Sequence, residues 1–331
     1  MVLTESPSVR VRVRQSAVIR EEEGLSILTF HSMGTRCRVC LVEPSRAAAN
    51  AYLDGLLNWV ADFEAKYSRF IDSSLVSRIN AAAGQHWVEV DEETERLLSL
   101  CAEFTFLTRG AFDPTALPLI RLWNWKANPP SIPTDATIRA TLDLVGWNKI
   151  QRRPGAIFLP RAGMCLDFGG IGKEYAVDLA LARAAQHGIQ DVLVDFGQDI
   201  RVHGRPPGRP AWHIGLENPL NPGTCWGSVA VTDHAVASSG DYLRHFEHAG
   251  RRYGHILDPR TGHPVDNGNR AVTVIAPSCT LAGILSTTAF ILGPKEGFHL
   301  IHGHYGASGA LFTQQGHHIT PRLYEHLVQS H

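Results

Sequence analysis

The sequence of 331 residues has no long hydrophobic run, no excess of basic charge and no repeat at a fixed period. No stretch approaches the ~20 apolar residues of a membrane-spanning helix, and the N-terminus lacks the apolar segment and cleavage site of a secretory signal. The formal net charge is −1 at pH 7, whereas a nucleic-acid-binding domain usually has a basic face. The sequence therefore predicts no membrane span, no nucleic-acid partner and no secretion.

Cysteine is sparse and its spacing does not indicate a metal site. The six cysteines are residues 37, 40, 101, 165, 225 and 279. Cys37 and Cys40 have the CxxC spacing, but no second pair completes a zinc site, and on a strand the two side chains would point to opposite faces. The histidines include no HExxH pair, and those near the C-terminus are expected at the surface. We expect core thiols in a reducing compartment.

The common nucleotide-binding fingerprints, a Walker A loop and GxGxxG, are also missing. Residues 166–180 instead contain a short apolar run ending at Asp167-Phe168, glycines at 169, 170 and 172, then Lys173 and a helical apolar pattern. This order predicts a strand, a tight turn and a helix whose start can bind an anion. Lys173 in the first turn opposes the helix dipole unless an anion lies nearby. An ordinary β–α connection with a surface lysine explains the stretch equally well.

Hydrophobic periodicity predicts most of the remaining elements. Helices are expected at residues 47–67, 91–108, 134–145 and 278–292, and strands within 25–42, 86–90, 150–159, 191–202, 212–216, 227–231, 253–258, 272–276 and 309–312. Asp91 is the expected N-cap of its helix, and Asp72 or Ser73 that of a short helix ending near Asn80. Residues 10–20 alternate valine with arginine and are followed by three glutamates at 21–23, which predicts that residues 1–24 are an exposed β-like arm or, preferably, a disordered lead-in. Residues 128–133 predict a surface loop.

Strands occur in adjacent runs joined by hairpin-length turns. This pattern favours an α+β fold with largely antiparallel sheets over a doubly wound parallel sheet.

Five separated motifs occur in an order that resembles one known family. They are Met-Gly-Thr at 33–35, Tyr-Ser-Arg-Phe at 67–70 with Ser-Arg-Ile-Asn at 77–80, Gly-Ala-Phe-Asp-Pro-Thr at 110–115, the glycine stretch at 166–178, and Ser-Gly-Asp-Tyr at 239–242 leading into His-Ile-Leu-Asp-Pro-Arg-Thr-Gly at 255–262. Together they resemble the ApbE family of FAD:protein FMN transferases over roughly residues 27 to 313.

The resemblance implies one two-lobed, T-fold-like domain over residues 25–331, with FAD bound in the cleft between the lobes. It implies that FAD is cut at its pyrophosphate in the presence of Mg²⁺. FMN is then joined to a Ser or Thr hydroxyl of a partner flavoprotein, and AMP leaves. The residues that match the family's flavin-nucleotide contacts are Met33, Phe70, Ala111, Phe112, Asp113, Asp167, Lys173, His255 and Ile256.

The chemistry of these residue types fits phosphoryl transfer, which needs charge neutralisation and a base for the attacking hydroxyl. His255 is the expected base because histidine titrates near neutral pH. A merely hydrogen-bonded strand histidine is the alternative. Asp258 is expected to be a turn residue, and Asp113 either caps a turn or contacts the ligand.

The sequence departs from the family where magnesium should bind. The family's Ala-Asp-Ala-Leu-x-Thr pattern has a metal-binding Asp and Thr, but here Gly283 replaces the Asp while Thr287 is kept. Mg²⁺ usually has at least one carboxylate ligand. Without the Asp, the remaining ligands would be Thr287, Ser286, the carbonyl of Gly170, phosphates and water. We therefore expect weaker Mg²⁺ binding than in the family, or none without FAD.

Two smaller departures are Glu174, in place of a glycine after the lysine, and Gln198, in place of the second glycine of a Gly-Gly-Asp turn. With Gly283 they leave open a homologue that binds FAD, or another nucleotide, without transferring FMN. The missing signal peptide and lipobox cysteine predict a cytoplasmic enzyme with a cytoplasmic acceptor.

Overall fold

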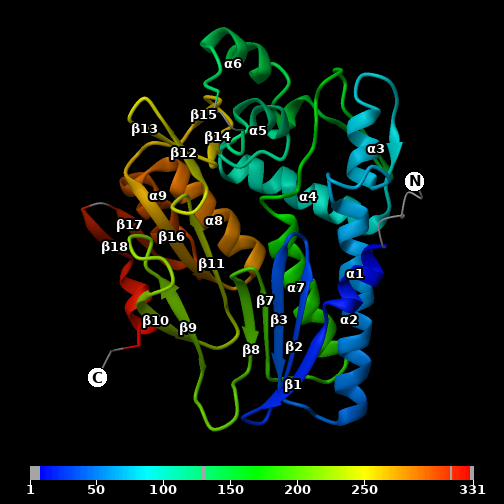
Figure 1. Ribbon diagram of the computed structural model, residues 1–331, viewed down its shortest axis with the longest axis vertical. Coiled ribbons are helices and arrows are strands. Elements are labelled where there is room, and N and C mark those ends of the chain that lie inside the picture. The colour runs from blue at the N-terminus through cyan, green and yellow to red at the C-terminus, as the bar shows by residue number, and fades with distance from the viewer. Residues whose placement is uncertain (1–7, 128–130, 314, 329–331) are drawn as a thin grey trace, which may run out of the picture.

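A nine-stranded sheet forms the centre of the protein (Figure 1). The computed structural model describes residues 8–127, 131–313 and 315–328. In sheet order the strands are β1 (Val18–Glu22), β2 (Leu25–Ser32), β3 (Thr35–Leu41), β7 (Val192–Phe196), β8 (Asp199–His203), β11 (Ala235–Gly240), β16 (Asn269–Ala276), β17 (Ser308–Thr313) and β18 (Gly316–Ile319). Every neighbouring pair is antiparallel, which confirms the predicted α+β class.

The two faces of this sheet carry different layers. One face packs on helices, namely α1 (Val9–Gln15), α2 (Arg46–Tyr67), α7 (Gly172–Gln186), α8 (Cys279–Leu292) and α9 (Pro294–Gly303), and holds the main core. The other face packs on the hairpin of β9 (Trp212–Glu217) and β10 (Cys225–Val231) and on the 3-10 helix Pro321–Glu325. Cys37 lies in the first core and Cys40 in the second, so the two thiols point to opposite faces as the strand period predicts.

The elements that belong neither to the nine-stranded sheet nor to the layers on its two faces gather at one end of the sheet, at the top of Figure 1. They are α3 (Leu75–Ala81), α4 (Glu92–Leu107), α5 (Leu117–Trp123), α6 (Asp135–Leu142), the 3-10 helix Trp147–Lys149, and the short strands β4 (Val88–Glu89), β5 (Gln151–Arg153), β6 (Ala156–Phe158), β12 (His245–His248), β13 (Arg251–Gly254), β14 (Leu257–Asp258) and β15 (His263–Pro264). A small separate core joins α5, α6 and the β12–β15 region.

The long helices α2, α4 and α8 begin and end close to the predicted bounds, and Asp91 is the N-cap of α4, where it accepts from the Thr94 N–H. The cap of α3 was predicted wrongly. Ser74, and not Asp72 or Ser73, accepts from the Ser77 N–H at 3.0 Å.

The strand predicted before α7 is absent from the described residues 164–171. The Leu166 backbone is satisfied by a side chain instead of a neighbouring strand. Its N–H donates to Asn80 Oδ1 at 2.6 Å, and Asn80 Nδ2 donates to its carbonyl at 2.9 Å. The next N–H, of Asp167, donates to the Pro114 carbonyl at 2.8 Å. The segment is therefore extended but outside any sheet.

The N-terminal segment was predicted correctly only in part. Residues 9–15 form the helix α1, which neither alternative predicted, whereas residues 18–22 form the exposed edge strand β1, as the β-like alternative predicted. The arginines that alternate with valine lie along α2, where Arg10 pairs with Asp62 at 2.6 Å and Arg12 with Glu64 at 2.5 Å. Val13 is fully buried between the layers. Tertiary ion pairs thus override a pattern that read as a strand or a disordered arm; residues 1–7 lie outside the described residues.

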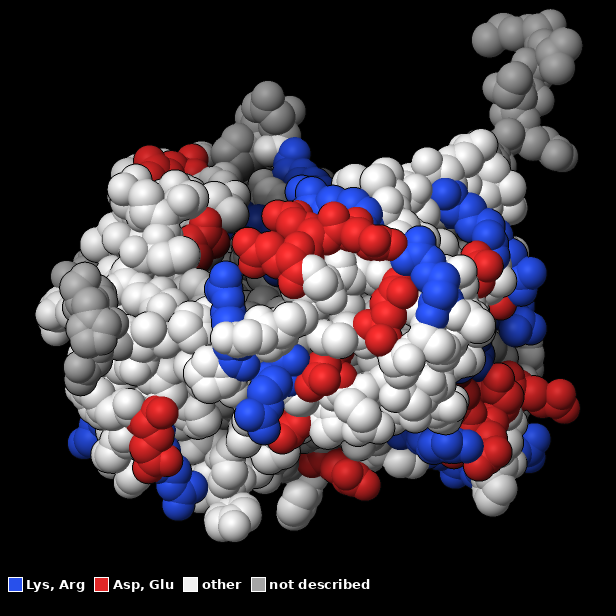
Figure 2. Space-filling view, turned by 90° about the horizontal axis from the view of Figure 1, so that it is seen from below, with Lys and Arg blue, Asp and Glu red and all other residues white. Residues whose placement is uncertain are grey.

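Four general expectations can be compared with the described chain. None of its helices combines the length and the apolarity needed to cross a bilayer. Basic and acidic side chains are interspersed on the face shown in Figure 2, rather than separated into one basic stripe. All six cysteines are free and only Cys225 is exposed. The predicted loop at residues 128–133 falls partly outside the described residues.

Candidate nucleotide and metal site

The glycine turn before α7 is open to solvent and is held from both sides. Gly169 and Gly170 are exposed. The Gly169 N–H donates to Asp167 Oδ1 at 3.1 Å, and Arg69 Nε lies 3.2 Å from Asp167 Oδ2. Burial raises the pKa of Asp167, although the Arg69 charge and the Gly169 N–H oppose that effect. The turn thus presents accessible backbone beside a mostly buried carboxyl, which suits close contact with a phosphate group.

The end of α2 places Phe70 next to that turn. The Phe70 side chain is 81% exposed, and the Arg69 guanidinium lies 4.4 Å from the centre of its ring. An exposed aromatic ring beside an arginine that also pairs with Asp167 can stack on a flat heterocycle.

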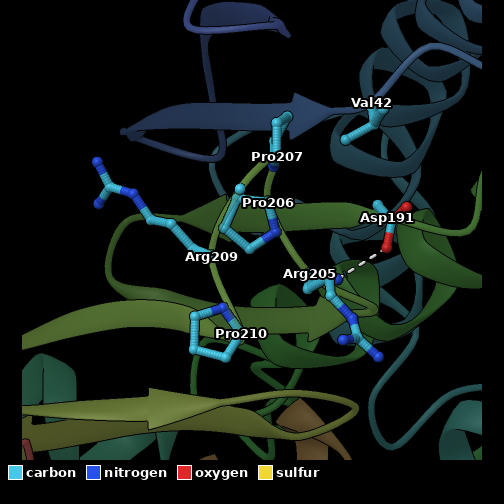
Figure 3. Close-up of a pocket in the computed structure, with 8 residues that line it drawn as sticks. Val42, Asp191, Arg205, Pro206, Pro207, Arg209 and Pro210 are labelled. Carbon is cyan, nitrogen blue, oxygen red and sulfur yellow. Dashed lines mark hydrogen bonds between the residues drawn. The ribbon is translucent and has the colours of Figure 1, made fainter.

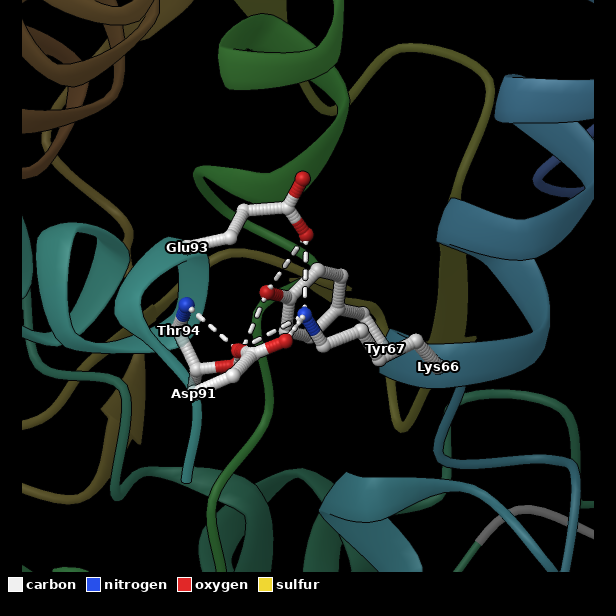
Figure 4. A network of polar contacts seen from close by, with 5 residues as sticks. All are labelled: Lys66, Tyr67, Asp91, Glu93 and Thr94. Carbon is white, nitrogen blue, oxygen red and sulfur yellow. Dashed lines mark hydrogen bonds and ion pairs between the residues drawn. The ribbon is translucent and has the colours of Figure 1, made fainter. Parts of the chain in front are cut away.

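A polar network fixes where α2 ends (Figure 4). Lys66 Nζ contacts Asp91 Oδ2 at 2.6 Å and Glu93 Oε1 at 3.0 Å, and the Tyr67 hydroxyl donates to the same Glu93 oxygen at 3.0 Å. The hydroxyls of Tyr67 and Thr94 are also 3.0 Å apart. The last turn of α2 is therefore clamped to the first turn of α4, and the residues that follow Tyr67 emerge at a defined position.

Met33 lies in the β2–β3 turn and has a left-handed backbone, with φ +51° followed by +71° at Gly34. Glu64 on α2 supports this turn, since its Oε2 accepts from the Met33 N–H at 2.8 Å and from the Ser32 hydroxyl at 2.7 Å. Burial by itself would raise the pKa of Glu64, but these bonds and the Arg12 charge lower it below its usual value. The strained Met33 conformation is thus stabilised from within the protein.

The loop at residues 110–115 contacts the glycine turn through Phe112. Its ring lies 3.6 Å from the place that a Cβ on Gly170 would take, and both Ala111 and Phe112 are buried. Asp113 caps the loop, since its Oδ1 accepts from the Thr115 N–H at 2.8 Å and its Oδ2 from the Trp147 N–H at 2.9 Å. Of its two possible roles, turn capping is the one that the geometry shows.

Lys173 forms an ion pair with Asp199, a buried residue at the start of β8. A lysine in the first turn of a helix needs an anionic partner, and here the protein supplies it. The position of Lys173 in the sequence is therefore explained without a ligand.

His255 follows β13 and is tied to Arg244. The His255 N–H donates to the Arg244 carbonyl at 3.0 Å, and the ring Nδ1 lies 3.2 Å from the same oxygen. Desolvation, reinforced by the Arg244 charge and opposed by that hydrogen bond, lowers the pKa of His255 to about 4. The ring is therefore neutral at pH 7. Because Nδ1 carries the hydrogen that the carbonyl accepts, Nε2 keeps its lone pair and can accept a proton.

The residues after His255 form a rigid turn. Ile256 is half-buried against the main core. Asp258 accepts from the backbone N–H of Arg260 at 2.9 Å and from its guanidinium at 2.8 Å, so it is the turn residue that we predicted. The Arg260 side chain in turn lies 3.7 Å from the position of a Cβ on Gly110, which brings this turn beside the 110–115 loop.

The helix α8 brings hydroxyls to the end of β11. Ser239 Oγ lies 2.8 Å from both Ser286 Oγ and Thr287 Oγ1. Ser286 is fully buried and also donates to the Gly283 carbonyl at 3.0 Å, whereas Thr287 is half-buried. Thr287 is accordingly the more accessible oxygen of the two.

Glu174 lies directly over Gly283. A Cβ on Gly283 would be 2.6 Å from Glu174 Cγ and 3.2 Å from its Oε1. Within the described residues, Glu174 Oε2 is buried with no hydrogen-bond partner. No group of three or more His, Cys, Asp and Glu side chains is placed to hold a metal there either. One unpaired carboxylate oxygen, an accessible hydroxyl and exposed glycine backbone fit a hard cation that keeps most of its water and phosphate ligands.

Two surface hollows lie elsewhere. One, of about 440 Å³, is shown in Figure 3 and is lined by Val42, Asp191, Arg205, Pro206, Pro207, Gly208, Arg209 and Pro210. The other, of about 460 Å³, borders the end of α2 and the start of α4. Neither contains a residue that we predicted to bind FAD.

The structure adds contacts that the motifs did not predict. Asp199 and Arg69 pair with predicted site residues, and Ser239 joins the α8 hydroxyls. Each of the three lies in a motif or turn noted in the sequence, but its partner is distant in sequence, so the pairing itself has no local signal. Gln198 occupies a left-handed turn position, φ +72°, with its N–H bonded to Asp195 Oδ1 at 2.9 Å.

Comparisons with known proteins agree with this arrangement. The model of the ApbE family matches residues 33–312. The FAD:protein FMN transferase of Treponema pallidum is 31% identical over 297 residues, covering 85% of this chain and 82% of that protein. The one from Vibrio cholerae is 30% identical over 277 residues, covering 82% of each. The crystal structure of the ApbE protein from Thermotoga maritima superimposes with a TM-score of 0.83 at 29% identity, over 92% of this chain and 100% of that one. The protein belongs to the ApbE family.

Proposed function

We propose that the protein transfers FMN from FAD to a Ser or Thr hydroxyl of an acceptor flavoprotein, with Mg²⁺, and releases AMP. Family membership and the names of the relatives support the reaction class. The observation in this chain that carries the proposal is His255, a neutral histidine whose Nδ1 is engaged and whose Nε2 is left to take a proton.

In the proposed reaction, His255 Nε2 accepts the proton of the acceptor hydroxyl. The hydroxyl oxygen forms a bond to the phosphorus of the FMN half, and the bond from that phosphorus to the bridging oxygen breaks. AMP leaves with the bridging oxygen. Lys173 neutralises charge on the pyrophosphate and the N–H of the exposed Gly170 donates to it, while Phe70 offers a ring on which the flavin or adenine can stack.

A bound Mg²⁺ adds charge neutralisation at the pyrophosphate. Thr287 and the carbonyl of Gly170 are the groups of this chain that would hold it, with Ser286 as a further hydroxyl. Their oxygen atoms are of the type that Mg²⁺ prefers.

A second function competes with this one because Gly283 supplies no carboxylate. In that case the protein binds FAD, or a related nucleotide, without transferring FMN. The cytoplasmic location stays a prediction in either case, and fractionation of the native cells would test it.

The experiment is intact-mass spectrometry of an acceptor protein that carries a Ser/Thr-Gly-Ala target site, incubated with the enzyme and FAD. We expect the added mass of FMN with Mg²⁺ and none with chelator. His255→Gln keeps a polar side chain at this position but removes the base, and we expect it to lower the rate of FMN transfer by about 10²–10⁴-fold. His248→Gln, at an exposed histidine of the same hairpin, is the control.

The pH profile of the same reaction gives an independent check. Because the pKa of His255 is lowered to about 4, the base stays unprotonated as the pH falls through the ordinary histidine range near 6.5. We expect the rate to hold down to about pH 5 and to fall below it. A rate that already halves near pH 6.5 would contradict the described environment of His255. No added mass under any condition, together with tight FAD binding, would favour the second function.

A further inference from the structure

Glu174 fills the space that a side chain at position 283 would need. The Glu174 Cγ lies 2.6 Å from the place of a Cβ on Gly283, closer than real Cβ atoms approach other atoms, and its Cδ and Oε1 lie at 3.2 Å. A side chain at 283 and the present Glu174 conformation therefore exclude one another. Glycine is unfavourable in the interior of a helix such as α8. Here it gives the room in which the Glu174 side chain lies.

The carboxylate of Glu174 is not satisfied by the protein around it. Its Oε2 is buried, and no donor among the described residues reaches it. The cations nearby are already engaged, since Lys173 pairs with Asp199, and Arg201 pairs with Asp178 at 2.8 Å. A buried carboxylate oxygen without a donor is rare in proteins, and a bound ion is one of its ordinary explanations.

The surroundings of this oxygen select the kind of ligand. Thr287 follows Gly283 by four residues and so lies on the same face of α8, and its hydroxyl is half-buried beside Ser239. Glu174 itself stands in the first turn of α7, directly after the exposed glycine backbone. The possible metal ligands are all oxygen atoms, they are few, and they lie next to the expected position of the phosphates. That set suits Mg²⁺, which takes one or two carboxylates and completes its shell with phosphate and water.

We propose that Glu174 is the carboxylate ligand of the divalent cation, and that it has exchanged places with the acidic residue expected at position 283. The carboxylate reaches the site from α7 instead of α8. Gly283 makes this possible, because a side chain at position 283 would occupy the space of the Glu174 side chain. This inference rests on the proposed function for the identity of the cation and of FAD. It removes the main argument for the competing function, because the missing carboxylate is supplied from the neighbouring helix.

The test measures binding of Mn²⁺, as a paramagnetic substitute for Mg²⁺, by electron paramagnetic resonance in the presence of FAD and without acceptor. Four variants are compared with the native chain: Glu174→Gln, Gly283→Asp, the double variant Glu174→Gly/Gly283→Asp, and Glu95→Gln. Glu95 is a half-buried helical glutamate that pairs with Arg152 at 3.0 Å, away from the site, and serves as the matched control.

We expect Glu174→Gln to weaken Mn²⁺ binding by at least about tenfold, the lower end of the losses that follow even from removing a group behind a metal ligand. The double variant should recover the native affinity, whereas Gly283→Asp alone should not tighten binding, because Glu174 occupies the same space. Glu95→Gln should leave the affinity unchanged.

Native affinity in Glu174→Gln, or no Mn²⁺ binding by the native chain, would overturn the inference. Metal binding is measured here without FMN transfer, so the two proposals can fail separately. Binding that depends on Glu174 in a chain that flavinylates no acceptor would uphold the inference and overturn the proposed function. Mg²⁺-dependent FMN transfer that is unaffected by Glu174→Gln would uphold the proposed function and overturn the inference about Glu174.

Discussion

Two carboxylates on α7, Glu174 and Asp178, lie one turn apart and both face α8, yet their surroundings differ completely. Asp178 Oδ1 accepts from the Cys279 N–H at 2.8 Å, and its Oδ2 accepts from the Thr280 N–H at 2.9 Å and from the Thr280 hydroxyl at 2.6 Å. Arg201 adds a charge-assisted bond at 2.8 Å. Glu174, one turn earlier, lies over a glycine with one oxygen unpaired among the described residues.

The comparison separates a carboxylate that holds the fold from one that is available to a ligand. At the Asp178 end the first two N–H groups of α8 are capped by another helix, and Ser278 caps the third. These are the donors that a helix cannot satisfy by itself. At the Glu174 end the same pair of helices leaves a buried carboxylate oxygen that no donor among the described residues contacts. The α7–α8 contact is thus structural at one end and open to function at the other.

Removing Asp178 should have the largest effect on stability. Asp178→Ala leaves two N–H donors and the Arg201 charge without their partner, so we expect a loss of about 3–5 kcal/mol in the free energy of unfolding. Urea denaturation monitored by circular dichroism would measure it. Glu174→Ala is the matched variant on the same helix. It removes an oxygen that has no partner, and we expect stability to be unchanged or slightly higher.

Two outcomes would contradict the distinction between the Asp178 end and the Glu174 end of the α7–α8 contact. If Glu174→Ala destabilised the protein as much as Asp178→Ala, Glu174 would be a structural residue whose partner lies outside the described contacts. If Asp178→Ala left the free energy of unfolding unchanged, the caps of α8 would contribute nothing measurable.

A smaller effect is expected from adding a single carbon atom between the helices. Gly283→Ala gains about 1 kcal/mol of helix propensity, but its Cβ would meet Glu174 Cγ at 2.6 Å. Overpacking of this kind costs about 1–3 kcal/mol. We therefore expect a net loss of about 1 kcal/mol in the free energy of unfolding, from the difference of these two terms.

The double variant Glu174→Ala/Gly283→Ala shows whether Glu174 is the source of that loss. Without the Glu174 stem only the helix propensity remains, so the double variant should be more stable than Glu174→Ala alone. A double-mutant cycle measures this coupling directly. Additive effects would mean that the two residues do not exclude each other.

An element of the fold could be predicted from the sequence where the interactions that determine it lie within a few residues of one another. Caps such as Asp91 and helices such as α2 were predictable, because spacing and capping act within a few residues. The N-terminal helix was not, since its arginines are stabilised by acids on α2 about 50 residues away.

The same limit applied to the site. The motifs indicated Lys173, His255 and Thr287, but not that Asp199 pairs with Lys173 or that Asn80 replaces a strand partner of Leu166. Glu174 and Gly283 were each recognisable as departures from the family pattern. Only their contact in space shows that they are two halves of one change.

A third carboxylate extends the comparison to the surface and has the smallest expected effect. Asp91 has partners like Asp178 but an exposed side chain, 60% accessible, beside Lys66 at 2.6 Å (Figure 4). Desolvation by itself would raise its pKa, but the bonds from Lys66 and Thr94 and the Lys66 charge together lower it to about 2. A carboxyl whose pKa is lowered on folding contributes stability above its unfolded pKa of about 3.9, and that stability is lost as the pH falls toward 2.

Lys66→Met should therefore destabilise the protein by less than about 1 kcal/mol at pH 7, because solvent screens an exposed pair. The difference between the variant and the native chain should shrink as the pH falls through 4, since the partner of Lys66 is then being protonated. Urea denaturation at pH 7, 5 and 3.5 would measure both quantities. A difference above about 2 kcal/mol at pH 7, or one that persists unchanged at low pH, would show that Lys66 acts through packing under Tyr67 and not through its charge. The contacts of Lys66 at the end of α2 would then stabilise the fold as those of Asp178 do, although the Lys66–Asp91 pair is exposed.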